Sequence, residues 1–450
     1  MNRYFNEKSN YDKYPVVNVP GMEAECRVGW RAISDRLEKD LSQIGKKVKV
    51  VVLECYQGVS DEEVVTALQS AFPASRWFFS ADAMKSPEQI DAILKQDITE
   101  DEIFGYMTRQ NMDCYFDGDK LPGIRSEIAA VTEGIVFVYG VGAAYVQPSY
   151  DLLVYADMAR WEIQMRFRRN EVSNVGISNR EERASLQYKR AFFVDWRICD
   201  RFKKKLMKKW DYVLDTNTAG NPKMATAKAI EAGLEKASRT PFRVVPFFDP
   251  GPWGGQWMKE VCDLDREVPN FAWCFDCVPE ENSLYLGFGD VRFELPSIDL
   301  VFAYPARLLG NPVYGRFGDE FPIRFDFLDT MEGGNLSLQV HPLTQYIQEK
   351  FGMHYTQDES YYMLDAAEDA TVYLGVKEGI EPEEMIDALN EAQESGCFDA
   401  EKYVGRYPVK KHDHLLIPAG TIHCSGTNGM VLEISATPYI FTFKLWDWGR

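Results

Sequence analysis

Two short clusters in the second half of the chain carry side chains that bind metal ions. In the first, LSLQVHP, Gln339 and His341 lie two residues apart, and Glu359 follows eighteen residues after His341. Alternate side chains of a β-strand point to the same face, so Gln339 and His341 would lie side by side. In the second cluster, HDHLLIPAGTIHCSGTN, His423 follows a Pro-x-Gly turn that directs the chain back toward the interior. These spacings predict that both clusters contribute to one site.

The four candidate side chains offer two imidazole nitrogens and two oxygens, which suits zinc and also manganese or iron(II). Glu359 begins the strand-like run ESYYML, and an antiparallel neighbour would bring its carboxylate beside the first cluster. A single histidine on a strand is more often a core residue than a ligand, but two clusters in this order predict a metal site. Three of the five histidines are less suitable as metal ligands: His354, His412 and His414. His412 is interpreted as a turn residue.

The elements that must position these residues are short β-strands. After residue 240, aromatic-rich runs alternate with Gly/Pro turns, a pattern typical of an all-β sandwich or barrel. One helical insertion, Glu381 to Gly396, interrupts them. The expected strands include NSLYLGFGDVRFEL (282–295), FPIRFDFLD (321–329), ESYYMLD (359–365), TVYLGV (371–376) and MVLEIS (430–435).

The first 240 residues have a different pattern, in which apolar strand-like runs alternate with amphipathic helices. This alternation predicts an α/β domain, a parallel sheet with flanking helices. We place the boundary at residues 236–246, which gives an α/β domain at 1–240 and a β-domain at 241–450. The lysine run KKKLMKK (203–209) is interpreted as a solvated helix face. The main expected elements are strands at 47–55, 134–140 and 152–157 and helices at 61–72, 160–169 and 225–237, with Ser60 as an N-cap.

Composition excludes several classes of function. The chain has 450 residues and a formal net charge of −19, which argues against binding to nucleic acid or to an anionic membrane surface. The segment MNRYFNEKSNYDKYP has no apolar region, so we expect no secretory signal, and no stretch approaches the roughly 20 apolar residues of a membrane span. The nine cysteines fit free thiols in a cytoplasmic protein. Cys274 and Cys277 form a CxxC on an expected strand, where they would point to opposite faces and form no zinc knuckle. The oligomeric state is not determined by the sequence.

Beyond the metal clusters, several motifs resemble those of the type I mannose-6-phosphate isomerases, a family of the cupin superfamily. They are WGG (253–255), GRFGDEFP (315–322), VYLGVKEG (372–379) and DWGR (447–450). The resemblance covers residues 241–450 and implies a cupin β-barrel. It also implies that zinc is bound by Gln339, His341, Glu359 and His423. The family continues into a second barrel after DWGR, which this chain is expected to lack.

The resemblance implies a metal-dependent aldose–ketose isomerase that interconverts mannose 6-phosphate and fructose 6-phosphate through a cis-enediol. The metal would stabilise the developing enediolate oxygen, and a general base would move a proton between C1 and C2. Glu433 matches a family carboxylate proposed as this base, and Ser337 matches a serine that contacts the phosphate. Lys444 lies near the position of a substrate-binding arginine. Arg324, Lys444 and Arg450 would supply cations for catalysis and for the sugar phosphate.

Two departures from the family leave an alternative open. Asp326 and Gln357 stand where the family has lysines, and phosphate recognition favours cations. The alternative is a metal-binding cupin that is non-catalytic or differently specific and senses a sugar or a sugar phosphate. A cupin dioxygenase using iron is a third interpretation, against which Gln339 in a ligand position and the isomerase-like flanking motifs count.

The N-terminal half contains a strand–loop–helix arrangement, KVKVVVLECYQGVSDEEVVTAL, of the kind found in P-loop proteins. It lacks the GxxxxGKS/T pattern, so it has neither the lysine for phosphates nor the hydroxyl for Mg²⁺. The segment DLLVYADMARWEIQMRFRR weakly resembles uridine-kinase-like proteins. We interpret residues 1–240 as a degenerate kinase-like domain with a regulatory, structural or ligand-binding role.

Overall fold

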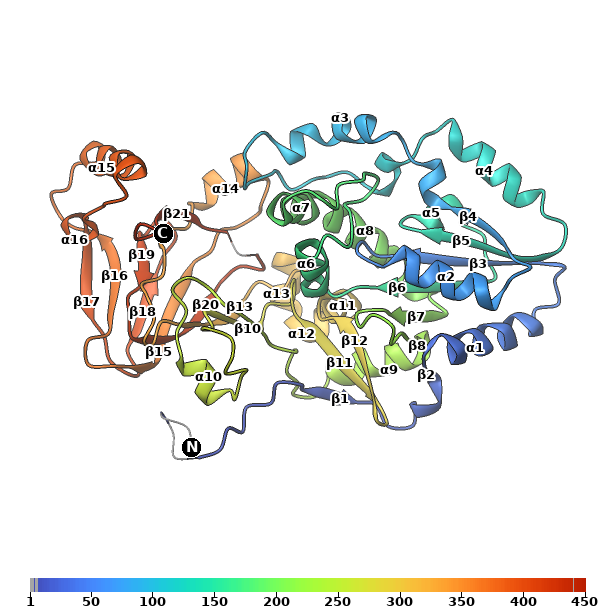
Figure 1. The fold of residues 1–450 in the computed structure, drawn as a ribbon, viewed down its shortest axis with the longest axis horizontal. Helices are drawn as coiled ribbons and strands as arrows, with labels where there is room; N and C mark the ends of the chain where they lie inside the picture. The colour runs from blue at the N-terminus through green and yellow to red at the C-terminus, as the bar shows by residue number, and fades with distance from the viewer. Residues whose placement is uncertain (1–3, 5–6, 440) are drawn as a thin grey trace. The chain divides into compact units, whose positions relative to one another are not determined.

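The computed structural model describes residue 4 and residues 7–439 and 441–450 (Figure 1). The chain divides into two compact units, each built from separate stretches of sequence. The α/β unit contains residues 16–242 and 283–310, and the β unit contains the described part of 1–15 together with 243–282 and 311–450. This differs from the contiguous domains 1–240 and 241–450 that the sequence predicted.

The hairpin at 283–296 accounts for most of that difference. Strands β11 (Ser283–Phe288) and β12 (Val291–Pro296) form as expected, but β11 pairs in parallel with β1 (Val16–Asn18) in a three-stranded sheet. Leu286 is fully buried and packs against α9 (Ala227–Ala237), where a Cβ added to Gly233 would lie 2.5 Å from its Cδ1. The hairpin therefore belongs to the α/β unit.

The main sheet of the α/β unit has seven strands in the order β2-β8-β7-β6-β3-β5-β4. The five strands from β7 to β4 are parallel, and β8 and β2 add antiparallel strands at one edge. The predicted strands correspond to β3, β5 and β6, and Ser60 caps α2 by accepting from the backbone N–H of Glu63. The bounds are β2 Cys26–Val28, β3 Val48–Cys55, β4 Arg76–Phe79, β5 Gly134–Gly140, β6 Leu152–Asp157, β7 Tyr212–Asp215 and β8 Lys223–Thr226.

Helices connect these strands, and the predicted helices at 61–72, 160–169 and 225–237 correspond to α2, α6 and α9. A short π-helical segment, Ala191–Asp195, joins α7 and α8 into one longer helical stretch. The bounds are α1 Trp30–Gln43, α2 Asp61–Ala71, α3 Pro87–Ile98, α4 Lys120–Ala129, α5 Ala143–Val146, α6 Arg160–Arg168, α7 Ala184–Arg190, α8 Trp196–Leu206, α11 Ile298–Ala303 and α12 Pro305–Leu309.

The interpretation of the lysine run as a solvated face is wrong for its first residue. Lys203 on α8 is only 1% exposed, whereas Lys205, Lys208 and Lys209 are exposed. Its ammonium group donates to both carboxylate oxygens of Asp157, at 2.7 and 2.8 Å, and to Oδ1 of Asp299 at 2.9 Å. Asp157 ends β6 and Asp299 lies on α11. The buried ion pair therefore attaches the inserted segment 283–310 to the main sheet.

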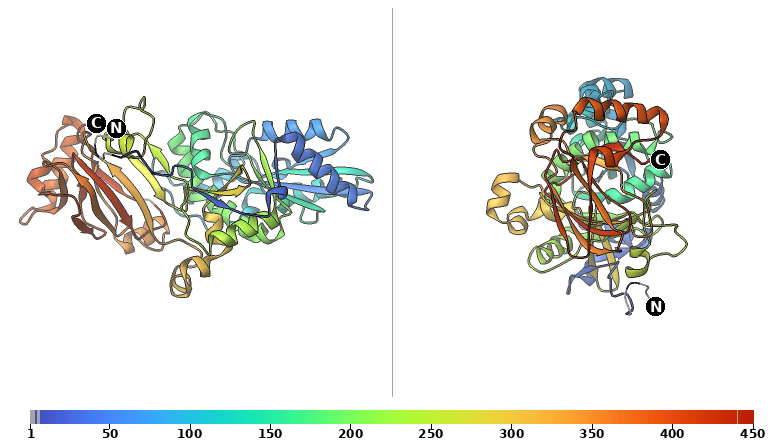
Figure 2. Two further views of the ribbon diagram at one scale, coloured as in Figure 1. Left: turned by 90° about the horizontal axis from the view of Figure 1, so that it is seen from below. Right: turned by 90° about the vertical axis from the view of Figure 1, so that its left-hand side faces the viewer.

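The β unit contains two antiparallel sheets. Their strand orders are β18-β15-β20-β13-β10-β9 and β17-β16-β19-β14-β21, and the ribbon views of Figure 2 show these strands. Both sheets supply residues to one buried core. Leu328 and Val431 of the first sheet pack in the same cluster as Val372 and Cys424 of the second. The bounds are β9 Phe247–Asp249, β10 Trp273–Cys277, β13 Arg324–Asp329, β14 Leu338–Val340, β15 Glu359–Ala366, β16 Thr371–Val376, β17 Val404–Pro408, β18 His414–Ile417, β19 His423–Ser425, β20 Gly429–Ser435 and β21 Phe443–Trp446.

The predicted helical insertion of the β unit is α15 (Pro382–Ser395). A bulge in β10 places Cys274 opposite Phe327 and Cys277 opposite Phe325. The two thiols therefore share a face, contrary to the expectation for a regular strand, and both are free, as are the other seven cysteines. The other helices of the β unit are α10 (Trp257–Val261), α13 (Asn311–Phe317), α14 (Thr344–Phe351) and α16 (Ala400–Tyr403).

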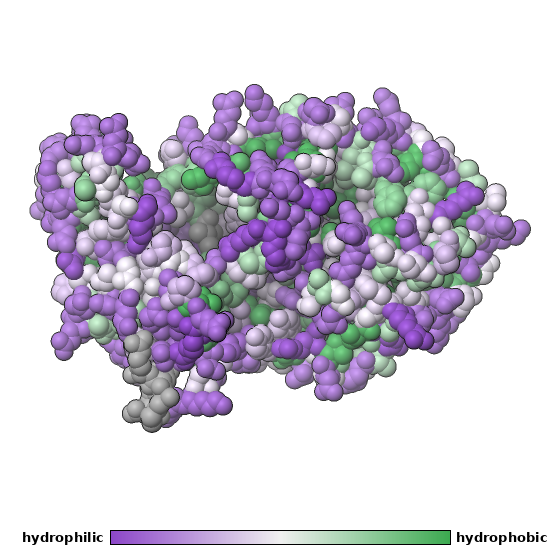
Figure 3. All heavy atoms as spheres, in the orientation of Figure 1, coloured by the Kyte–Doolittle hydropathy of each residue, from purple (hydrophilic) through white to green (hydrophobic). Residues whose placement is uncertain are grey.

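The described residues include no helix that combines the length and the apolar character needed to cross a membrane. On the face drawn in Figure 3, hydrophilic side chains predominate and the apolar ones are scattered. This agrees with the acidic composition, whose net charge is −19.

Replacing Lys203 by methionine should destabilise the protein by about 3–5 kcal/mol, because it leaves Asp157 and Asp299 buried without their cation. Chemical denaturation followed by circular dichroism measures the change. Lys205→Met on the exposed face of the same helix is the control and should stay within about 0.5 kcal/mol of the parent protein. Equal stability of the two variants would show that the buried pair does not hold the inserted segment.

Candidate metal centre

The register of three neighbouring strands of the β unit builds a polar surface on the inner face of one sheet. In the first row across β13, β20 and β15, Arg324 and Glu359 both lie opposite Ser435. Alternate residues share a face, so the next two rows lie on the same side. The second row is Asp326, Glu433 and Tyr361, and the third is Leu328, Val431 and Met363. Two polar rows therefore lie on an apolar third row.

The second sheet supplies the nitrogen donors. His423 begins β19 and lies opposite Gln339 of β14, and His341 directly follows β14. His341 and His423 are 1% and 0% exposed, and their ring centroids are 5.1 Å apart. Both sheets thus contribute to one site, as the spacing of the two sequence clusters predicted.

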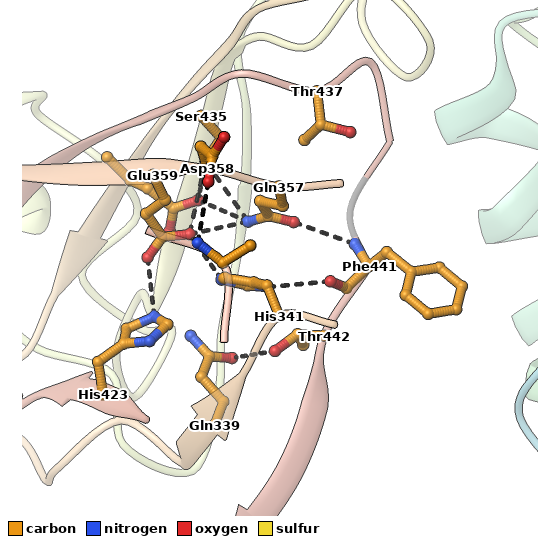
Figure 4. Close-up of polar contacts among 12 residues, drawn as sticks. Gln339, His341, Gln357, Asp358, Glu359, His423, Ser435, Thr437, Phe441 and Thr442 are labelled. Atoms are coloured by element: carbon orange, nitrogen blue, oxygen red, sulfur yellow. Dashed lines mark hydrogen bonds and ion pairs between the residues drawn. The ribbon is translucent and has the colours of Figure 1, made fainter. Parts of the chain in front are cut away.

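The carboxylate of Glu359 lies between the two histidines (Figure 4). Its Oε2 is 2.9 Å from Nε2 of His341, and its Oε1 is 2.9 Å from Nε2 of His423. One ligand atom from each residue can be chosen so that all three lie within 4.8 Å of one another. Burial acts to raise the pKa of Glu359, but His423 and His341 outweigh it and hold the pKa well below its usual range.

Backbone carbonyls determine which nitrogen of each ring carries the hydrogen. Nδ1 of His341 lies 2.9 Å from the carbonyl oxygen of Phe441, and Nδ1 of His423 lies 2.8 Å from that of Thr421. A carbonyl can only accept, so each Nδ1 donates, and in the neutral ring Nε2 presents its lone pair to Glu359. Two such nitrogens and a carboxylate converge at one point, an arrangement that could hold a metal ion.

The charges around Glu359 also fit a divalent cation. Nη2 of Arg324 donates to Oε1 of Glu433 at 2.5 Å, and Nη1 lies 3.3 Å from Oδ1 of Asp326. Arg324, Asp326, Glu359 and Glu433 are at most 5% exposed. When all three carboxyl groups are ionised, they and the one guanidinium leave a formal excess of two negative charges in this group. Buried charges in proteins are paired or bind metals, so a doubly charged ion would balance the site.

Gln339, the fourth predicted ligand, is half-buried and lies beside the histidines in Figure 4. Its Oε1 accepts a hydrogen bond from the hydroxyl of Thr442 at 3.0 Å. An amide oxygen held in this way would supply a further ligand of the type that zinc, manganese and iron(II) accept. Its ligation stays a prediction.

Three other predicted site residues gather around Asp447. The hydroxyl of Ser337 donates to Oδ1 of Asp447 at 2.5 Å, and Arg450 donates to the same oxygen at 2.9 Å. Nζ of Lys444 lies 3.3 Å from Oδ2. These hydrogen bonds join them to Asp447 rather than to the buried histidines, so their roles in catalysis and substrate binding stay predictions.

The remaining histidines lie at the surface. His412 has a φ of 76° in a turn, as the sequence predicted, and its Nδ1 is 2.8 Å from the hydroxyl of Tyr362. His354 and His414 are exposed. The five histidines therefore separate into two buried ones at Glu359 and three at the surface.

Sequence reasoning missed two polar residues of the site. Gln357 and Ser435 are 2% and 0% exposed, and both contact Glu433. Gln357 was noted only as a departure from the family. Each lies two residues from a predicted site residue, Gln357 before Glu359 and Ser435 after Glu433. The same-face rule for strands identifies Ser435, which lies on β20 with Glu433, whereas Gln357 precedes β15 and is placed only by the structure.

The sequence matches a protein-family model and a set of curated proteins. A protein-family model described as "Domain of unknown function (DUF8485)" matches residues 29–239. A mannose-6-phosphate isomerase of Streptococcus mutans is 26% identical over 205 residues, which cover 44% of this chain and 58% of the relative. Mannose-6-phosphate isomerase ManA of Bacillus subtilis is 25% identical over 214 residues, covering 46% and 60%. Somewhat less than half of this chain is homologous to mannose-6-phosphate isomerases.

The chain spans about 60% of the length of these curated relatives. Solved structures of mannose-6-phosphate isomerases match a similar share. The Bacillus subtilis enzyme has 22% identity and a TM-score of 0.39, with 47% of this chain and 63% of that chain covered. A zinc-bound mannose 6-phosphate isomerase has 13% identity and a TM-score of 0.35, covering 45% and 69%.

We expect the purified protein to bind one divalent ion, with zinc preferred, through His341, Glu359 and His423. Replacing Glu359 and His423 together by alanine should abolish stoichiometric zinc binding, because one of the two imidazoles and the carboxylate are lost. Metal analysis and competition with a chromophoric chelator measure it. His414→Ala, at an exposed histidine, is the control. Unchanged zinc content in the double variant would contradict the assignment of the site.

Proposed function

We propose that the β unit is a cupin barrel and acts as a metal-dependent isomerase of mannose 6-phosphate and fructose 6-phosphate. The buried arrangement of His341, Glu359 and His423, with Glu433 in the adjacent row, is the observation that carries this proposal. Homology to mannose-6-phosphate isomerases over part of the chain supports the substrate.

Isomerisation of an aldose to a ketose moves one proton between C2 and C1 and passes through a cis-enediol. His341, Glu359, His423 and Gln339 would hold the metal. A bound divalent ion would supply electrostatic stabilisation to the oxygen on which negative charge develops. His341, Glu359, His423 and Glu433 are buried, so we propose that the site limits exchange of the transferred proton with solvent.

Glu433 is the proposed base. It is 4% exposed, and its Oε1 accepts from Ser435 at 2.7 Å and from Arg324 at 2.5 Å. Burial, Asp326 and Glu359 raise the pKa of this carboxyl well above its usual range. A raised pKa suits a group that must accept a proton from one carbon and donate it to the next.

Recognition of the phosphate is assigned to the basic residues that the sequence predicted. Arg324 lies on the inner face two residues before Asp326, where it provides a buried cation. Lys444 and Arg450 share Asp447 with Ser337 and are more exposed than Arg324, so their charges are proposed to act on the anionic substrate during the reaction. The proposal gives Arg324 and Ser337 to substrate binding and Lys444 and Arg450 to catalysis.

The competing function is a metal-binding sugar sensor without turnover. Asp326 favours it, because burial raises the pKa of this carboxyl to about 6 and it stands where the family has a lysine. Arg324 also forms an ion pair with Asp326, with 3.3 Å between Nη1 and Oδ1, so part of its charge is already paired within the protein. A sensor would bind sugar phosphate and metal but would not isomerise the sugar.

The α/β unit is proposed to be a degenerate kinase-like domain. The loop between β3 and α2 lies where the order of the parallel strands reverses, which is where ligands bind in such sheets. Here the carbonyl of Gly58 in that loop accepts from Nη1 of Arg166 at 2.8 Å. A side chain of the protein itself thus contacts the loop, which supports a structural or regulatory role. The nine free thiols are consistent with the proposal that the protein is cytoplasmic.

A coupled assay with mannose 6-phosphate, with and without chelator, tests the function. Glu433→Gln should lower kcat by roughly 10²- to 10⁴-fold, the usual contribution of a general base, and leave zinc content unchanged. Glu384→Gln, at an exposed glutamate on α15, is the matched control. A parent protein that holds zinc but shows no turnover would reject the isomerase and favour the sensor.

A further inference from the structure

We propose that Gln357 is a positioning residue that fixes the carboxylate of Glu359 for metal binding and aligns Glu433 beside it. The part concerning Glu433 rests on the proposed function, whereas the part concerning the metal does not. Gln357 is 2% exposed and lies two residues before Glu359. Figure 4 shows its amide between Glu359 and the backbone of Phe441.

The hydrogen bonds of Gln357 determine how its amide is turned. The backbone N–H of Phe441 donates to Oε1 at 3.1 Å, so the NH₂ group faces the carboxylates. Nε2 donates to Oε2 of Glu359 at 2.8 Å and lies 3.3 Å from Oε1 of Glu433. One neutral side chain therefore links the metal-binding carboxylate to the proposed base.

Phe441 closes a ring of contacts around Glu359. Its N–H holds Gln357, and its carbonyl holds Nδ1 of His341 at 2.9 Å. Gln357 and His341 then meet on the same oxygen, Oε2 of Glu359, at 2.8 and 2.9 Å. The carbonyl of Phe441 thus orients His341, and its N–H orients Gln357, which in turn orients Glu359. Loss of Gln357 would remove one orienting contact from Glu359 and from Glu433 together.

The ring depends on amide chemistry. An amide both donates and accepts, whereas a lysine ammonium has only donors and could not accept from Phe441. A lysine would also cancel one of the two excess negative charges near Glu359, which would weaken attraction for a divalent ion. Methionine matches the length of glutamine but makes none of these hydrogen bonds.

The test compares Gln357→Met and Gln357→Lys with the parent protein and with Gln345→Met, at an exposed glutamine on α14. Zinc affinity of the apoproteins is measured by competition with a chromophoric chelator. Melting curves of the apoproteins check folding. We expect both Gln357 variants to lose roughly 10- to 100-fold in zinc affinity, the usual effect of removing a residue that orients a metal ligand. The control should bind zinc as the parent does.

Kinetics at saturating zinc separate positioning from substrate binding. Gln357→Met should lower kcat while KM for mannose 6-phosphate stays near the parent value, because Glu433 is misaligned and the substrate contacts remain. Parent-like zinc affinity in both folded variants would overturn the proposal. Loss of zinc affinity in a protein whose parent form does not turn over mannose 6-phosphate would support the positioning role and reject the isomerase.

Discussion

The site depends on one electrostatic constraint, the burial of the Glu359 carboxylate between the Nε2 atoms of His341 and His423. Each Nδ1 faces a backbone carbonyl, so in the neutral form of each ring Nε2 would present its lone pair to an anion. Acceptors that face one another away from water are costly to bury. A bound cation would remove that cost, so the same arrangement that is costly without a metal would favour binding one.

Strand register makes this constraint compatible with a stable fold. Glu359 and Tyr361 point to the inner face of β15, and Met363 follows on the same face in the apolar row. The same period of two places Arg324 and Asp326 beside Leu328 on β13. A shift of one residue in either strand would turn the charged groups away from the interior and expose the core residues. The apolar row therefore fixes the alignment that the polar rows require.

Local sequence rules brought the candidate ligands to notice because their spacing is a property of single strands. Gln339 and His341, two apart, and His423 after its turn needed no knowledge of the tertiary fold. The partner sheet of the hairpin at 283–296 could not be predicted, because β1 pairs with it from almost 270 residues away in the chain. The burial of Lys203 likewise depends on Asp299, which lies on a distant segment. The alternation of side chains along the sequence predicts a strand and which of its residues share a face. Which strands lie beside it depends on pairing between segments that are distant in the sequence.

Each unit is built from separate stretches of the sequence, so the chain cannot be cut into the two units at a single position. A piece ending at residue 240 would lack the hairpin that covers α9, and a piece beginning at 241 would carry that hairpin without β1. Leu284, Leu286, Phe293 and Leu295 are fully buried in the intact chain. Exposing one such side chain costs roughly 1.5–3 kcal/mol, so four together approach the whole stability of an ordinary domain. The change of sequence character near residue 240 is therefore a change of fold class and not a place at which either unit becomes independent.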